Sequence, residues 1–415
     1  MNAADTAWML VSTALVLLMT PALGLFYGGL ARAKNALNTV MMSLAALGVV
    51  GVLWALIGYS LAFGPGTGFW GGAAFGLLRH VGLEPKNGIP HLLFAVYQGT
   101  FAIITAALIS GAIVERVRFT PYLVFIAAWS LFVYAPVAHW VWGGGWLGRM
   151  GALDFAGGTV VHINAGVAAF VAARVVGPRA DFGRRALLPH NVVLTVIGAG
   201  LLWFGWFGFN AGSALGANDG AVVALANTLL APCATLLMWT LLDLARARRA
   251  TAVGAATAIV VGLVAVTPAA GLVSPISALV LGAVAAFPSY FALLYRARTS
   301  LDDSLDVVAA HGVGGVVGAL LTGVFASRAW GAPADGAMLG NLHQLLVQGV
   351  AVIAVIAYAA AGTYLLLKLI GGFAPLRATA RDQAIGLDVA AHGEEAYTDG
   401  EGAILVHPDT AGGAA

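Results

Sequence analysis

Two pairs of ionisable residues in this apolar chain share one spacing. Asp154 lies eight residues before His162 in DFAGGTVVHINAG, and Asp303 lies eight residues before His311 in DSLDVVAAHGVGG. Each histidine lies in a run apolar enough to span a membrane, where an ionisable side chain is costly and marks a candidate functional site. Imidazoles there can donate and accept protons, so we predict that His162 and His311 form the working centre. The alternative is that each is a core histidine bonded to a backbone carbonyl.

The composition is that of an integral membrane protein. Hydrophobic residues make up 60% of the 415 residues and Asp, Glu, Lys and Arg only 9%, against about 25% charged residues in soluble domains. The 55 glycines suit helices that pack closely in lipid. The net charge of +2 gives no indication of a nucleic-acid partner. Cys233 is the single cysteine, which excludes an intrachain disulfide and a cysteine-rich metal site.

A membrane span needs about 20 mostly apolar residues, and this criterion predicts eleven spans and an all-α polytopic fold. They lie near residues 7–30, 40–63, 90–113, 119–138, 158–176, 190–211, 221–244, 251–267, 270–294, 306–327 and 343–370. If residue 1 lies outside, only Arg79, Lys86, Arg149 and Arg328 of the 20 basic residues fall on the outer side. The positive-inside rule then places the N-terminus outside and the C-terminus in the cytoplasm. The first apolar run is long enough to span and lacks a basic leader, so we expect no cleaved signal peptide.

The number of spans between the two motifs predicts an inverted repeat. His162 lies in the fifth span and His311 in the tenth, and five crossings reverse the direction of the second half. The halves should be related by a pseudo-two-fold axis in the membrane plane. His162 then approaches the midplane from the outer half and His311 from the inner half, so that the two imidazoles can meet.

Five strings carry a resemblance to a known family. VWGGGWLG, DFAGGTVVHINAG, WFGFNAGSA, QGTFAIITAALISGAIVERVRF and DDSLDVVAAHGVGG resemble those of the ammonium transporters of the Amt/MEP/Rh family, from about residue 5 to the tail. The resemblance implies eleven spans with a five-plus-five repeat, and a homotrimer in the cell (inner) membrane with one pore in each subunit. It also implies that ammonium or ammonia, with methylammonium as an analogue, passes twin histidines without a cofactor or a metal.

The resemblance also implies roles for aromatic residues. Trp142, Phe101 and Ser213 match an outer vestibule that recruits ammonium, Phe101 and Phe209 match a stacked gate, and Trp206 is a possible lining residue. A ring face attracts a cation by about 0.5 to 2 kcal/mol, and a hydroxyl can accept an N–H group. The alternatives are an interfacial anchor for Trp142 and ordinary helix packing for Phe101, Phe209 and Trp206.

The aspartates have competing interpretations. Asp154 matches the family's acidic residue near the outer site, and Asp303 is its counterpart in the second repeat. Two roles compete for Asp154: contact with the cation, or capping of a helix beside GG. We favour a structural and electrostatic role for both residues. Asp302 and Asp306 are predicted to be solvated loop charges or an N-terminal cap.

Selectivity follows from desolvation. Moving a bare ion into a low-dielectric medium costs on the order of 20 kcal/mol in the idealised limit. Ammonium can avoid this cost by giving a proton to a histidine or a water chain, whereas potassium has no proton to give. We therefore expect His162 and His311 to act as hydrogen-bonding and proton-relaying groups. Neutral ammonia conduction and electrogenic ammonium transport both remain open.

The chain divides into a transmembrane domain, residues 1–372, and a cytoplasmic regulatory tail, residues 373–415, which has no spanning run. GLDVAAHGEEAY resembles the family's tail, which implies docking across neighbouring subunits and regulation by a PII-type signal protein such as GlnK. The alternative is a solvated terminus, at least for the last ten residues.

Three other function classes are alternatives to ammonium transport. One is an ammonium sensor that signals through a PII-type partner, although the tail is short for a signalling domain. Another is a different secondary transporter or cation channel, which the lack of an in-membrane carboxylate cluster disfavours. An enzyme is disfavoured because no nucleophile and base occur at a recognisable spacing.

Overall fold

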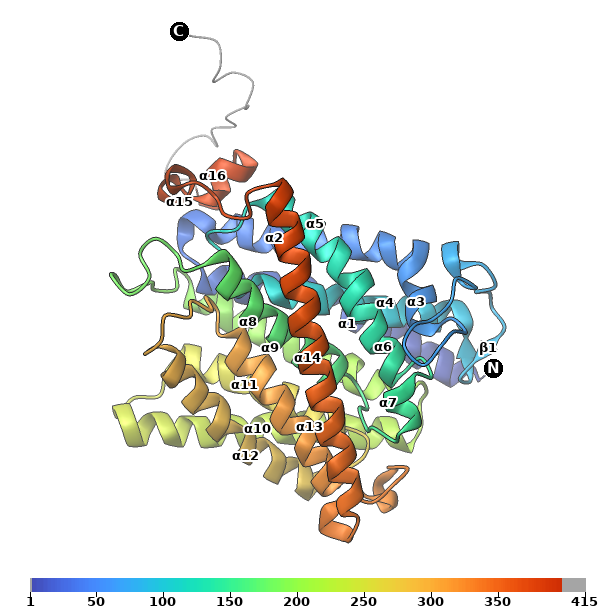
Figure 1. Cartoon of the computed structure of the whole chain (residues 1–415). Helices are drawn as coiled ribbons and strands as arrows, with labels where there is room; N and C mark the ends of the chain where they lie inside the picture. Colours follow the sequence, from blue (N-terminus) through green and yellow to red (C-terminus); the bar gives the residue numbers. More distant parts are fainter. Residues whose placement is uncertain (1, 398–415) are drawn as a thin grey trace.

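The structure is a computed structural model that describes residues 2–397, and these residues are almost entirely helical (Figure 1). The helices of the first half are α1 (Ala3–Leu30), α2 (Ala36–Leu53), α3 (Tyr59–Phe63), α4 (His91–Ser110), α5 (Phe119–Trp129), α6 (Ala135–Val141), α7 (Trp146–Arg149) and α8 (Asn164–Val176). Those of the second half are α9 (Val192–Gly212), α10 (Asp219–Ala247), α11 (Ala252–Val266), α12 (Pro275–Arg296) and α13 (Gly314–Phe325), followed by α14 (Leu342–Phe373), α15 (Ala380–Ile385) and α16 (Leu387–His392). One antiparallel hairpin joins β1 (Pro85–Lys86) to β2 (Ile89–Pro90).

The prediction of eleven spans is confirmed. Within residues 2–397, 11 helical stretches are long and apolar enough to cross a membrane. The fourth stretch runs over Phe119–Arg149 and so extends beyond the predicted end at residue 138. The reason is that α6 carries the apolar run on to Val141, and the glycines at 143–145 form a tight connection to α7.

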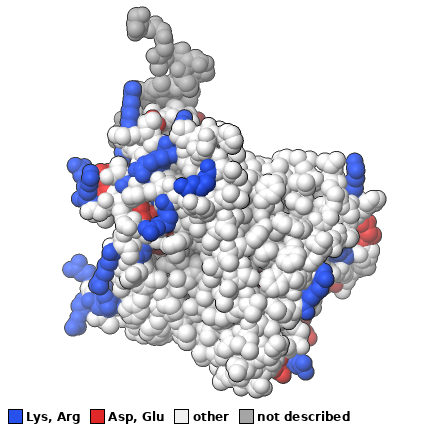
Figure 2. All heavy atoms as spheres, viewed as in Figure 1, with Lys and Arg blue, Asp and Glu red and all other residues white. Residues whose placement is uncertain are grey.

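The surface charge matches a membrane protein. On the face shown in Figure 2, Lys and Arg gather at the end of the molecule where α15 and α16 lie, and few appear at the opposite end. A wide uncharged band separates the two ends. Such a band suits the hydrocarbon layer of a bilayer, in which charged side chains are expensive.

The two halves of the chain have the same local structure around their histidines. Each histidine lies in one wide π-type turn, η5 (Gly158–Ile163) or η7 (Val308–Val313), that leads directly into α8 or α13. Helix α8 packs on η7, and α13 packs on η5. Gly166, four residues after His162, touches the backbone of Gly312, and a Cβ atom placed on Gly315, four residues after His311, would lie 3.1 Å from Cβ of His162. The segments therefore cross in the same way from both sides, as an inverted repeat requires.

Candidate functional site

A cavity of about 300 Å³, on the side predicted to be outer and called the outer cavity below, contains the three predicted recruitment residues. Its lining is Phe63, Asn87, Phe94, Gln98, Phe101, Val141, Trp142, Phe155, Ser213 and Leu215. The indole N–H of Trp142 donates to the carbonyl oxygen of Asp154 at 2.8 Å, which fixes the ring. The Ser213 hydroxyl donates to the carbonyl oxygen of Phe209 at 2.8 Å, so its lone pairs are left to accept an N–H group.

Two phenylalanines separate this cavity from the interior. The rings of Phe101 and Phe209 stack with centroids 4.1 Å apart and an interplanar angle of 29°, and each side chain is 1% exposed. Phe101 lines the outer cavity, whereas Phe209 lines the next cavity inward. The predicted pair therefore lies between the two cavities.

A small buried chamber surrounds the histidine pair. It has a volume of about 20 Å³, enough for about one water-sized molecule, and its other lining residues are Met19, Leu23, Phe26, Ile104, Leu108, Val161, Leu202, Trp206, Phe209 and Val260. The Trp206 ring stacks on His162 with centroids 5.4 Å apart, and its indole N–H donates to Thr267 Oγ1 at 2.9 Å. Apart from the imidazoles, the wall is apolar, so an ion has little solvation there.

The two imidazoles are hydrogen-bonded to each other. Nδ1 of His162 and Nδ1 of His311 lie 3.2 Å apart, and the residues are 1% and 4% exposed. One Nδ1 must donate and the other must accept, so the two Nε2 atoms differ: one is an acceptor and one carries a proton. Within residues 2–397, Nε2 of His162 has no hydrogen-bond partner. The pair thus presents free hydrogen-bonding capacity and a shared proton.

The aspartates hold the turns that carry the histidines. The Asp154 carboxylate accepts the backbone N–H groups of residues 157–160 at 2.6 to 3.1 Å, and it also accepts the Thr159 hydroxyl. Asp303 accepts the N–H groups of Val307 at 3.1 Å and Val308 at 2.7 Å. The pKa of Asp154 is raised because burial outweighs these hydrogen bonds, which act to lower it. Its contacts are those of a helix cap.

Replacing Asp154 with alanine should destabilise the protein. The change leaves four buried N–H groups without their acceptor, at about 1 to 3 kcal/mol for each unsatisfied group before relaxation. We expect a lower Tm in detergent together with at least a tenfold loss of uptake, and a smaller loss in Asp154→Asn. The exposed Asp219 provides the control Asp219→Ala. An unchanged Tm with lost uptake would instead indicate direct contact with the cation.

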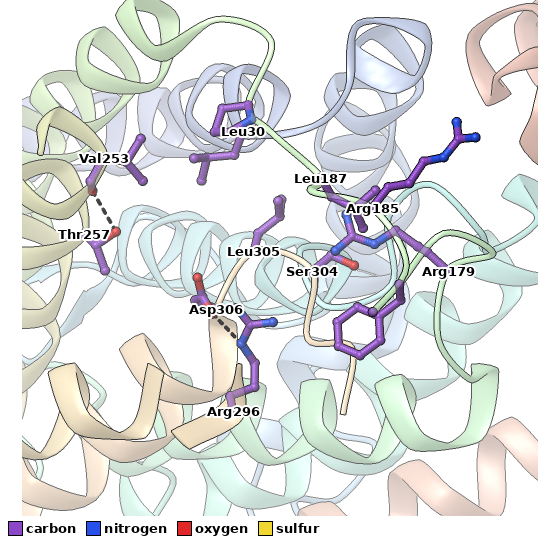
Figure 3. A pocket seen from close by; sticks show the side chains of 13 residues that line it. Leu30, Arg179, Arg185, Leu187, Val253, Thr257, Arg296, Ser304, Leu305 and Asp306 are labelled. Carbon is purple, nitrogen blue, oxygen red and sulfur yellow. Dashed lines mark hydrogen bonds and ion pairs between the residues drawn. The ribbon is translucent and has the colours of Figure 1, made fainter. Parts of the chain in front are cut away.

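A further cavity, on the side predicted to be inner and called the inner cavity below, has a volume of about 280 Å³. Figure 3 shows the side chains that line it. The face of α1 that lines the chamber through Leu23 and Phe26 continues to this cavity through Leu30. In the wall of this cavity Asp306 forms an ion pair with Arg296, with Oδ1 2.8 Å from Nε. The pKa of Asp306 is raised to about 7, chiefly by burial, although the positive charge of Arg296 opposes this rise.

The prediction that Asp302 is a solvated loop charge is wrong. Asp302 is 1% exposed and accepts three hydrogen bonds from Arg179, at 2.7, 2.9 and 2.8 Å. Burial alone would raise its pKa, but these bonds and the charge of Arg116 hold it below the ordinary value. The loop before α13 folds inward because Arg179, from the loop after α8, supplies the counter-charge. Asp306, for which the same prediction was made, forms an ion pair with Arg296, and its side chain is 25% exposed.

Two contributors to the site were missed at the level of sequence. Gln98 lines the outer cavity, and its signal was an amide within an apolar run. Arg116 is completely buried and donates to the carbonyl oxygen of Asp302 and to Ser304 Oγ, each at 2.6 Å. It therefore fixes the loop that leads to Asp303. The sequence identified Arg116 only as a basic residue at the end of a span.

Eleven membrane-spanning helices, with cavities on both sides of a buried histidine pair, define an α-helical membrane transport protein. The chain belongs to the Ammonium Transporter Family, whose sequence model matches residues 7–397. It is 44% identical over 404 residues to an ammonium transporter of Bacillus subtilis, covering 96% of this chain and 100% of that protein. It is 48% identical over 403 residues to an ammonium transporter of Aquifex aeolicus, covering 96% and 94%.

Solved structures show the same fold. Saccharomyces cerevisiae Mep2 has a TM-score of 0.87 and 37% sequence identity, covering 92% of this chain and 88% of that one. A structure named Sensor Amt Protein has a TM-score of 0.87 and 30% identity, covering 94% of this chain and 98% of that one. The family assignment made from the five sequence strings is confirmed.

Proposed function

We propose that this protein moves ammonium nitrogen across the cell membrane by removing a proton from ammonium before the nitrogen passes the histidine pair. The observation that carries the proposal is the Nδ1 to Nδ1 hydrogen bond between His162 and His311 inside an apolar chamber that holds about one small molecule. Such a chamber can admit neutral ammonia, because ammonia loses far less solvation than an ion.

Recruitment is assigned to the outer cavity. Phe101 and Trp142 offer ring faces, and Ser213 offers an oxygen, so an ammonium ion can exchange part of its hydration for cation–π and hydrogen-bonding contacts. The Phe101 and Phe209 rings then limit access to the chamber. Asp154 supports both sites, since its carbonyl oxygen fixes Trp142 and its carboxylate caps the turn that carries His162.

The imidazoles supply the proton chemistry. A deprotonated Nε2 can accept an N–H from the incoming nitrogen, and the shared Nδ1 proton allows the pair to exchange donor and acceptor roles. The released proton either returns to the outer side or follows through the pair. The first route gives neutral transport and the second gives electrogenic transport.

Reconstitution in liposomes tests this function. Current and internal pH are recorded on pulses of ammonium, with protein-free liposomes as the control. We expect a protein-dependent ammonium influx. A pH change without current indicates neutral passage, whereas a current that scales with ammonium indicates that charge also moves. No influx above that of protein-free liposomes would contradict the proposal.

A sensor is the second candidate. The likeness to the structure named Sensor Amt Protein favours it, and the partner would be a PII-type signal protein at the cytoplasmic face. The same liposome assay separates the two functions. A transporter produces a net ammonium influx, whereas a sensor needs only to bind ammonium.

We assign the tail to regulation in the cytoplasm, with the N-terminus outside and the subunits in a homotrimer. Within the chain, Asp388 accepts the N–H groups of Leu37 at 3.0 Å and Asn38 at 2.7 Å, at the beginning of α2. The N–H of Ala378 donates to the carbonyl oxygen of Arg116 at 2.8 Å. The tail is therefore tied to the residue that holds the loop before Asp303. The predicted solvated last ten residues lie outside the described residues.

Removing the chain after Phe373 should leave the pore folded but change its regulation. We expect the rate of methylammonium uptake to change at least twofold and to lose its response to the nitrogen status of the cells. Truncation after Tyr397 keeps α15 and α16 and is the matched control. Identical uptake at high and low nitrogen, before and after truncation at Phe373, would contradict the regulatory role.

A further inference from the structure

Lys86, in the outer hairpin, places its ammonium group inside a cage of four aromatic rings. Its Nζ lies 4.9 Å from the ring centroid of Phe75, 5.3 Å from Phe94, 5.4 Å from Tyr59 and 5.9 Å from Phe63. The Tyr59 and Phe63 rings stack with centroids 5.5 Å apart, and Phe63 and Phe94 meet edge to face at 5.2 Å. These distances are within the range of cation–π attraction.

No carboxylate in residues 2–397 forms an ion pair with Lys86. Its Nζ donates to the Tyr59 hydroxyl at 3.1 Å, and that oxygen lies 2.6 Å from Nε2 of His91. Nδ1 of His91 is in turn 3.3 Å from the exposed carboxylate of Glu84. Along this chain of contacts, Tyr59 and His91 separate Lys86 from the carboxylate of Glu84. Burial lowers the pKa of Lys86, as expected for a half-buried cation without a charged partner.

The cage shares a wall with the outer cavity. Phe63 and Phe94 surround Lys86 and also line the cavity that contains Phe101, Trp142 and Ser213. Asn87, the next residue in the hairpin, lines the same cavity. A covalently attached primary ammonium group is thus held behind the wall of the site assigned to free ammonium, and aromatic rings contact it as they would contact the free ion.

We propose that Lys86 sets the ammonium affinity of the outer cavity by holding a fixed positive charge behind its shared aromatic wall. The inference rests on the proposed recruitment of ammonium in that cavity. Two like charges repel, and rings already polarised by one cation attract a second one less strongly. For two unit charges about 10 Å apart at an effective dielectric constant of about 40 to 80, Coulomb repulsion weakens binding about two- to fourfold. Lys86 therefore keeps binding weak enough for ammonium to leave inward.

The test compares charge removal with charge retention. Lys86→Gln and Lys86→Met remove the charge, and Lys86→Arg keeps it. Purified protein is titrated with methylammonium, with tryptophan fluorescence as the binding signal, and the half-saturation of uptake is measured in proteoliposomes. Both uncharged variants should bind about two- to fourfold more tightly without a higher maximal rate, whereas Lys86→Arg should match the wild type. Concentrated NaCl should reduce the difference, because salt screens the repulsion.

Arg79→Gln is the matched control, since Arg79 is an exposed cation in the same outer segment and should leave affinity unchanged. Equal shifts in Lys86→Gln and Lys86→Arg, unchanged binding, or weaker binding without the charge would each overturn the proposal. Thermal unfolding separates these outcomes from misfolding, and Lys86→Met retains most of the apolar stem if Lys86→Gln unfolds. If the wild type binds methylammonium but does not transport it, the proposed transport function is wrong. The binding titration then still tests the effect of Lys86 on affinity.

Discussion

Leucine in place of either His162 or His311 is expected to reduce ammonium uptake at least tenfold or to remove discrimination against potassium. The two imidazoles share one hydrogen bond, so removing either ring ends the exchange of donor and acceptor roles. Positioned acid–base groups typically contribute about 10²- to 10⁴-fold. Because the residues act as a pair, the double variant should lose little more than either single variant. Uptake of labelled methylammonium, with and without excess potassium, measures both effects.

A third histidine provides the control for this experiment. His343 is exposed at the beginning of α14, so His343→Leu should retain wild-type uptake. Thermal unfolding in detergent shows whether the pore variants remain folded. If His162→Leu and His311→Leu both fold and keep wild-type uptake and ion discrimination, the histidines are core residues and the relay is wrong.

Gly166→Ala is expected to reduce uptake at least tenfold, because Gly166 lies where the two repeats cross. An added Cβ atom would overlap the backbone of Gly312, next to His311. Backbone atoms cannot rotate away as a flexible side chain can, so η7 and α8 must separate. Overpacking of this kind typically costs about 1 to 3 kcal/mol. We expect a lower Tm and at least a tenfold loss of uptake, since separation also breaks the contact between the imidazoles.

Gly200 is the matched control for Gly166. It also lies within a membrane helix, α9, but a Cβ atom there would meet no other atom within 4 Å. Gly200→Ala should therefore keep full uptake, and its helix should gain up to about 1 kcal/mol from the better helix propensity of alanine. Wild-type uptake in Gly166→Ala would show that the crossing tolerates an added atom and that the position of the histidine pair does not depend on it.

The features predicted correctly from sequence were those that depend on local pattern or on repetition. Each span is a continuous apolar run, so its existence can be recognised without knowing its neighbours. The contact between His162 and His311 was predicted from two observations. Each histidine follows an aspartate by eight residues, and each half has five spans, so the second half is inverted. The five strings identified the family, and they also indicated which aromatic residues would gather around the outer cavity.

The features that the sequence could not predict depend on partners far apart in the chain. Asp302 reads as a loop charge until Arg179, more than a hundred residues earlier, folds against it. Arg116 reads as an inner basic residue, although its guanidinium organises the loop before Asp303. Lys86 reads as one of four outer cations, because nothing in its local sequence shows that four rings will surround it. The polar partners of these residues are set by the tertiary structure, and the periodic pattern of apolar residues in the sequence does not reveal them.

The comparison of potassium with ammonium tests the central claim most directly. Proteoliposomes are loaded so that either ammonium or potassium is the only permeant cation, and influx of each is measured at equal concentration. Loss of the proton at the histidine pair predicts saturable influx of ammonium nitrogen and no potassium influx above that of protein-free liposomes. Potassium influx at a rate comparable to that of ammonium would contradict the claim, because an ion that cannot lose a proton would then have crossed the same chamber.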